Sequence, residues 1–329
     1  MAAFPSSDKT FTTKVDGVDY PQASHINDLQ GEVSAVELFL LSATPSGTMW
    51  NGKLSVSSSS DFLTYSLLNN AGNVPSSTDP VFININGTIR QVTAQAGFTI
   101  NPATNWFNSG SAELGTLAVP YFVYAVWDSN SSAVSLTIAR KPHYRIVAAA
   151  MATTTSENHI YNYSNYTVGD DMANIGYFEA ILSLSRTGHL WSVPTFTGDN
   201  LRHAPTMRSQ RMTWTPTTGG YSADPTGIYE YILDGALMFL YVRETANGTS
   251  NATNLTYTAP MTAVTLTGFV WLGIAAAFDN TASLTTTSRV EIPSASNVLT
   301  LYPNMSGGST WTGSGGKRVA SGSISYAIG

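Results

Sequence analysis

The sequence predicts a mostly β protein, in which a short N-terminal helix precedes antiparallel β-sandwich and jelly-roll domains. Three observations lead to this prediction. Short runs of alternating apolar residues follow one another from about Trp50 to the C-terminus, separated by clusters of Gly, Asn and Ser. Only 11% of the residues are charged, against about 25% in ordinary globular domains, which suits sheets with uncharged polar outer faces. A single stretch near the start has helical periodicity.

The chain divides into a series of predicted segments. Residues 1–22 form an extended leader. Residues 23–44 form a short helix, with Pro21 and Ser24 as start signals and a turn cluster at 44–47 as the stop. A first β-sandwich then covers residues 45–143, a bridging β-segment covers 144–205, and a jelly-roll-like domain covers 206–329.

The predicted helix carries an apolar stripe with alternating steps of three and four residues: Ile26, Leu29, Val33, Val36 and Leu40. These are the a and d positions of a heptad, and β-branched residues at both positions favour three strands over two. The stripe therefore predicts a homotrimer. It also suits the core face of one amphipathic helix lying on a sheet, because coiled coils usually need about three to four heptads.

The first sandwich has predicted strands at 53–57, 62–68, 81–86, 88–93, 97–100, 119–127 and 133–139. Asn86-Gly87 is the strongest hairpin signal, because a type I′ turn needs positive φ at both central residues. The bridging segment adds an apolar run at 175–184, which predicts further strands.

The last domain again alternates, with predicted strands at 212–215, 227–233, 236–242, 255–257, 264–277, 289–292, 298–302 and 319–327. Asp234-Gly235 lies between two of these runs and predicts a second hairpin turn. Short strands at this spacing are typical of a jelly roll.

Composition and missing motifs exclude several kinds of function. A net charge of −6 and a pI of 5.3 argue against nucleic acid as a partner. The chain has no cysteine, and its histidines lack ligand spacing, so we expect no metal and no cofactor. The longest apolar runs are too short for insertion into a membrane. Common hydrolase, nucleotide-binding and zinc-protease motifs do not occur, so the prediction is that the chain is not an enzyme.

Aromatic residues give the candidate binding sites, because a flat ring can pack on the apolar side of a sugar. The candidates for binding a glycan are Tyr161, Tyr163, Tyr166 and Trp311. Trp311 lies in a Gly-rich stretch and is the best candidate for an exposed ring, although aromatic residues usually lie in cores. Trp127 and Trp271 lie in apolar strands and are expected in cores.

Acidic residues give an alternative of a different class, a polysaccharide depolymerase, since glycoside hydrolysis needs a pair of carboxylates. Asp170, Asp171 and Glu179 are the clustered acids. The reading we favour for Asp170 and Asp171 is a solvated turn without catalytic function.

Several stretches resemble virion domains of tailed bacteriophages. In the C-terminal third they are Met212-Thr-Trp-Thr-Pro-Thr217, Gly219-Gly-Tyr221, residues 229–242, residues 257–260 and the ending Ser321-Gly-Ser-Ile-Ser-Tyr326. Residues 113–142 resemble a segment of phage tail and fibre proteins, and residues 18–29 resemble the leader and helix that precede their first domain. Such domains commonly form trimers, as the apolar stripe predicts independently.

The expected function is therefore that of a structural phage protein. In the favoured interpretation it is a trimeric tail appendage of the receptor-binding type. Its leader would attach it to other virion proteins, and its distal β-domains would meet a host surface glycan. The alternative is a capsid decoration or head-fibre protein. Because the first residues resemble no secretory signal, we expect synthesis in a host cytoplasm and release in the virion by lysis.

Overall fold

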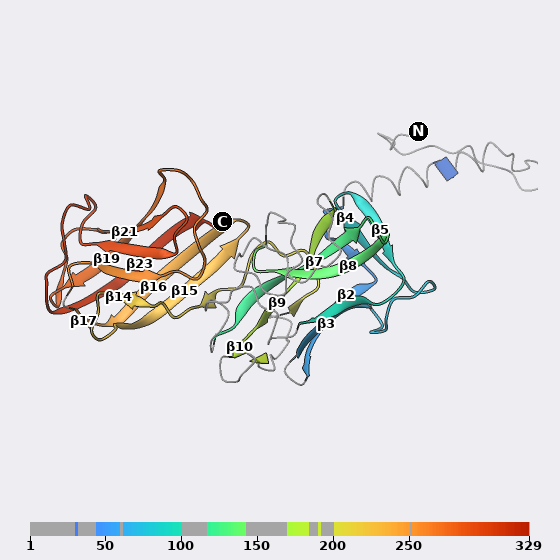
Figure 1. Ribbon diagram of the computed structural model, residues 1–329, viewed down its shortest axis with the longest axis horizontal. Helices are drawn as coiled ribbons and strands as arrows, with labels where there is room; N and C mark the ends of the chain where they lie inside the picture. Colours follow the sequence, from blue (N-terminus) through green and yellow to red (C-terminus); the bar gives the residue numbers. More distant parts are fainter. Residues whose placement is uncertain are drawn as a thin grey trace, which may run out of the picture.

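The computed structural model describes residues 30–31, 44–59, 62–100, 117–142, 170–183, 190–191, 201–250 and 252–328. These residues form two β-rich units that lie side by side, the second drawn in orange and red in Figure 1. All strand pairs are antiparallel, so the predicted mostly β, antiparallel class is confirmed. Of the predicted helix, Gln30 and Gly31 are described and are helical, whereas Ile26, Leu29, Val33, Val36 and Leu40 lie outside the described residues.

Three sheets build the first unit. One has the order β1-β4-β5, another β2-β3-β6, and the third β12-β9-β7-β8. The strands are β1 (Met49–Trp50), β2 (Gly52–Ser59), β3 (Phe62–Asn69), β4 (Val81–Ile85), β5 (Thr88–Val92), β6 (Ala96–Ile100), β7 (Val119–Asp128), β8 (Ala133–Ala139), β9 (Met172–Ala180) and β12 (Leu201–Arg202). A separate pair joins β10 (Leu182–Ser183) to β11 (Leu190–Trp191). The strands predicted for 53–139 match this set closely.

The hairpin between β4 and β5 turns where the sequence predicts. Asn86 and Gly87 have φ values of 50° and 86°, as a type I′ turn requires. Asn84 supports the turn, because its side-chain oxygen accepts a hydrogen bond of 2.9 Å from the backbone N–H of Gly87.

The sheet around β7 is buried on both faces. Its inner face, with residues such as Val123 and Ile175, packs on the other two sheets in a single core. Its outer face carries Phe122, Tyr124 and Tyr177, which belong to the core of the C-terminal unit. The hydroxyl of Tyr177 lies 3.7 Å from the sulfur of Met212, across the junction between the units.

Strand β9 lies within residues 144–205, the segment that the sequence predicts as a bridge between the two units. It pairs along its length with β7, and β12 pairs with β9. These strands therefore complete the first unit. The reason is the composition of β7, which is apolar on both faces and needs neighbours that are apolar too.

The C-terminal unit is a curled half-barrel (Figure 1). Its strand order is β13-β15-β16-β23-β19-β21-β22-β18-β14, and in addition β17 pairs with β23 and β20 pairs with β19. The strands are β13 (Met212–Thr213), β14 (Thr218–Gly219), β15 (Thr226–Asp234), β16 (Leu237–Ala246), β17 (Gly248–Thr249), β18 (Leu255–Thr258), β19 (Val270–Asp279), β20 (Ala282–Ser283), β21 (Ser288–Pro293), β22 (Val298–Tyr302) and β23 (Gly316–Ala327). They form one hydrogen-bonded sheet, whereas the predicted jelly roll would have two.

Residues 214–217 connect the two outer strands of this sheet. The N–H of Trp214 donates to Tyr229 on β15, and the carbonyl of Thr217 accepts from Thr258 on β18. The indole of Trp214 also donates to the Thr258 carbonyl, at 3.0 Å. Local chain connectivity thus brings the edges together, which explains why the sheet curls on itself instead of splitting in two.

Two turns refine the predicted strands of this unit. Asp234 pairs with Leu237, and Gly235 has a φ of 58°, so glycine takes the first central position, as in a type II′ hairpin turn. The predicted strand at 264–277 begins too early. Gly268 has a φ of 70°, and the N–H of Phe269 bonds the carbonyl of Leu266, so a turn precedes β19.

Candidate binding surface

The outer face of the half-barrel exposes apolar side chains on β19. Leu272 and Ile274 are 57% and 56% exposed, while the alternate residues Ala275 and Ala277 are buried in the core. Both faces of this strand are therefore apolar. The run at 264–277 carried this signal in the sequence, because the outward positions of β19 at 270, 272, 274 and 276 are all apolar.

Neighbouring strands extend this apolar face into a shallow groove. Strand register places Tyr241, Ser323 and Ile274 in one row across β16, β23 and β19. Phe239 and Ser325 form the next row. The serines are short and lie between larger side chains, which leaves a groove of about 280 Å³ along β23. We call Phe239, Tyr241, Leu272, Ile274, Ser323 and Ser325 the outer strip.

Ion pairs border the outer strip on both sides. On the β15 side, Arg211 contacts Glu230 at 3.1 Å, and Glu230 is opposite Tyr241 in the sheet. On the β21 side, Arg289 contacts Glu291 at 2.8 Å. The strip itself contains no charged residue. An uncharged, partly apolar centre with a polar border is the usual anatomy of a protein interface.

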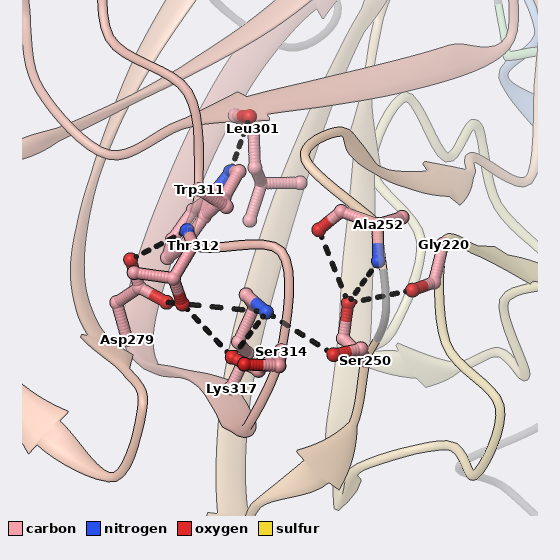
Figure 2. Close-up of polar contacts among 9 residues, drawn as sticks. All are labelled: Gly220, Ser250, Ala252, Asp279, Leu301, Trp311, Thr312, Ser314 and Lys317. Atoms are coloured by element: carbon pink, nitrogen blue, oxygen red, sulfur yellow. Dashed lines mark hydrogen bonds and ion pairs between the residues drawn. The ribbon is translucent and has the colours of Figure 1, made fainter.

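The structure places Trp311, the sequence's best candidate for an exposed ring, in the core. Its side chain is 2% exposed, and its indole N–H donates to the Leu301 carbonyl at 2.9 Å (Figure 2). Its backbone N–H bonds the carbonyl of Thr253. The Gly-rich segment thus folds back over the half-barrel, and its one large aromatic residue anchors it, so no flat ring face is available to a sugar.

A buried lysine lies beside this anchor. The Lys317 side chain is fully buried, and its Nζ atom donates to the carbonyls of Ser250 and Ser314, at 3.4 and 3.3 Å (Figure 2). Asp279 lies 3.9 Å away, and its carboxylate also accepts hydrogen bonds from Thr312. Burial lowers the pKa of Lys317, and the charge of Asp279 opposes this shift. The contacts fasten two loops and the end of β19 to one another, which indicates a structural role.

A buried carboxylate inside the half-barrel joins four strands. Glu244 accepts hydrogen bonds from the hydroxyls of Tyr229 and Tyr257, at 2.9 and 2.8 Å, and from the backbone N–H of Val319 at 2.5 Å. The ladder between β19 and β23 shifts register at this point, where Ala277 is opposite Val319 and Ala276 is opposite Ser321. Glu244 therefore satisfies an N–H at a β-bulge. Burial raises the pKa of Glu244, although these hydrogen bonds oppose the shift.

This raised pKa predicts a pH dependence of stability. In the unfolded chain the Glu244 carboxyl has its ordinary pKa of about 4.3. In the native protein its pKa is higher. Between the two pKa values the native state binds more protons, so its stability falls as pH rises. We expect the free energy of unfolding of the wild type to fall, relative to that of Glu244→Gln, as pH rises from about 4 towards neutrality.

Urea unfolding of both proteins at several pH values measures this difference. The other carboxylates are common to both proteins, so the difference between them isolates Glu244. A difference that stays constant, or that changes in the wild type's favour, would show that the carboxylate is not penalised by burial.

The acidic candidates have local structural partners. Asp170 is buried, contrary to the favoured solvated turn, and accepts hydrogen bonds from the backbone and hydroxyl of Ser129. Asp171 accepts one from Asn86 at 2.8 Å, and Glu179 accepts one from Tyr177 at 2.5 Å. These contacts tie turns and strands of the first unit together.

The structure describes only some of the remaining aromatic residues that the sequence singled out. Tyr161, Tyr163 and Tyr166 lie outside the described residues. Trp127 and Trp271 pack against the two cores but are only partly buried, and the guanidinium of Arg90 lies 3.8 Å from the centre of the Trp127 ring.

Among the residues that the structure describes, no group of His, Asp and Glu is arranged to hold a metal ion. Within the same ranges, no helix is long and apolar enough to cross a bilayer.

Comparison of this chain with protein-family models, curated proteins and solved structures finds no match.

Proposed function

We propose that this chain is a structural protein of a phage particle that assembles as a homotrimeric tail appendage. The observation that carries the proposal is the exposed outer strip, in which Leu272 and Ile274 are more than half exposed. Contiguous apolar surface on a soluble protein marks an interaction site. A chain that exposes such a surface is suited to assembly.

The rest of the molecule fits this role. The leader at 1–22 attaches the trimer to other virion proteins, and the stripe from Ile26 to Leu40 sets the threefold axis. The two β-units share a core cluster that includes Tyr177, so they present a continuous, cysteine-free body to the host surface. Outward serines such as Ser321 and Ser323 give the sheet a hydrated polar surface with few charges.

The mass of the purified full chain in solution tests the assembly. We expect sedimentation equilibrium and native mass spectrometry to give three times the chain mass of 35.1 kDa. A mass of one chain that persists at micromolar concentration contradicts the proposal.

A competition experiment tests the place on the particle. Purified trimer is expected to block adsorption of the phage to its host, because it occupies the receptor. Heat-unfolded chain is the control and has no effect. If adsorption is unchanged and particle images show the chain on the capsid, the protein is a decoration of the head and the tail assignment is wrong.

A further inference from the structure

We propose that the outer strip is the contact between the half-barrels of neighbouring copies of this chain, with Leu272 and Ile274 facing the threefold axis. This inference rests on the proposed homotrimer and adds where the copies touch. It places a second interface about the same axis as the N-terminal stripe, in a part of the chain more than two hundred residues away.

The composition of β19 is the first step. In an antiparallel sheet with one face in water, outward residues are normally polar, as Arg289 and Glu291 are on the adjacent strand β21. On β19 the outward positions hold Val270, Leu272 and Ile274. A strand that is apolar on both faces is typical of a sheet that is buried on both faces. We infer that the outer face of β19 is covered in the assembled protein.

The charge of the chain indicates which partner covers the outer strip. Each copy carries a net charge of −6, so copies repel unless they meet where charge is absent or paired. The outer strip is uncharged, and the arginines along its two long sides have carboxylate partners, Glu230 for Arg211 and Glu291 for Arg289. Two such faces can meet at the strip without burying a lone charge, provided that Arg243, the next outward residue of β16, stays at the exposed end of the contact. A strongly basic or acidic partner would leave its own charges unpaired there, at a large cost.

Shape favours protein side chains as the occupant. The volume of the groove, about 280 Å³, lies just below the range for small-molecule pockets, which is about 300–1,000 Å³. The floor is made by Ser323 and Ser325, and their small size lets a neighbouring strand approach closely. Beside this floor Leu272 and Ile274 project outwards, so the face offers both a ridge and a groove to an identical copy.

The absence of cysteine from the chain makes a direct test possible. In the variant Leu272→Cys the introduced thiol is unique, and we expect it to be protected from a maleimide reagent in the trimer. The expected rate is about tenfold or more below that of the matched control Ser222→Cys, an exposed position away from the strip. Mild oxidation is expected to link pairs of Leu272→Cys chains within the trimer, because equivalent residues approach one another at a threefold axis.

Each outcome is informative. A trimer in which the Leu272→Cys thiol reacts as fast as that of Ser222→Cys overturns the inference and leaves the proposed homotrimer standing. Protection in a chain that sediments as a monomer overturns both, because the strip is then covered from within one chain. Circular dichroism confirms folding, and Ile274→Cys replaces Leu272→Cys if that variant does not fold.

Discussion

Replacing Trp311 by alanine is expected to lower the free energy of unfolding of the chain by about 3–5 kcal/mol. The side chain is 2% exposed, so the substitution leaves a cavity among residues such as Leu301 in the half-barrel core. It also leaves the Leu301 carbonyl without the indole N–H that it accepts at 2.9 Å. Urea unfolding followed by circular dichroism measures the loss.

The conservative variant Trp311→Phe separates packing from hydrogen bonding. It keeps most of the apolar volume and removes the indole N–H, so we expect a loss of about 1–3 kcal/mol, less than for alanine. If Trp311 were instead an exposed platform for a sugar, alanine would change stability by less than about 0.5 kcal/mol and would weaken glycan binding. That pair of results would contradict the buried position.

The fold class and the first hairpins could be predicted from the sequence because their causes are local. Asn86-Gly87 permits positive φ at both positions, and alternation marks the strands on either side. The place of β9 could not be predicted in this way. Its pairing with β7 joins residues about fifty positions apart, and nothing local to residues such as Tyr177 says which strand lies beside it.

The candidate site likewise combines features that local sequence predicts with features that depend on long-range contacts. Trp311 stands among glycines, which predicts a loop correctly, but the loop is held down by contacts with Thr253 and Leu301 that only the folded sheet brings near. The outer strip had a local signal, because Leu272 and Ile274 occupy positions where an exposed strand needs polar residues. That signal predicts an uncovered apolar face only once the inner face of β19 is known, and this depends on how the sheet curls.

The buried ion pair of Lys317 and Asp279 predicts an asymmetric response to mutation. Asp279→Asn is expected to cost about 3 kcal/mol, because it leaves the ammonium of Lys317 buried without an opposite charge. The 3.9 Å separation of Nζ and Oδ1 places this value at the lower end of the usual range of about 3–5 kcal/mol.

Adding Lys317→Met to Asp279→Asn is then expected to restore stability, even though it removes a second polar group. The double variant buries no charge at this position, and the methionine keeps the apolar stem of the lysine in place. The carbonyls of Ser250 and Ser314 lose their donor, so recovery is partial. Urea unfolding of the wild type, both single variants and the double variant measures the coupling. Losses that simply add would contradict this account, because they would mean that the ammonium of Lys317 is stabilised by the two carbonyls alone.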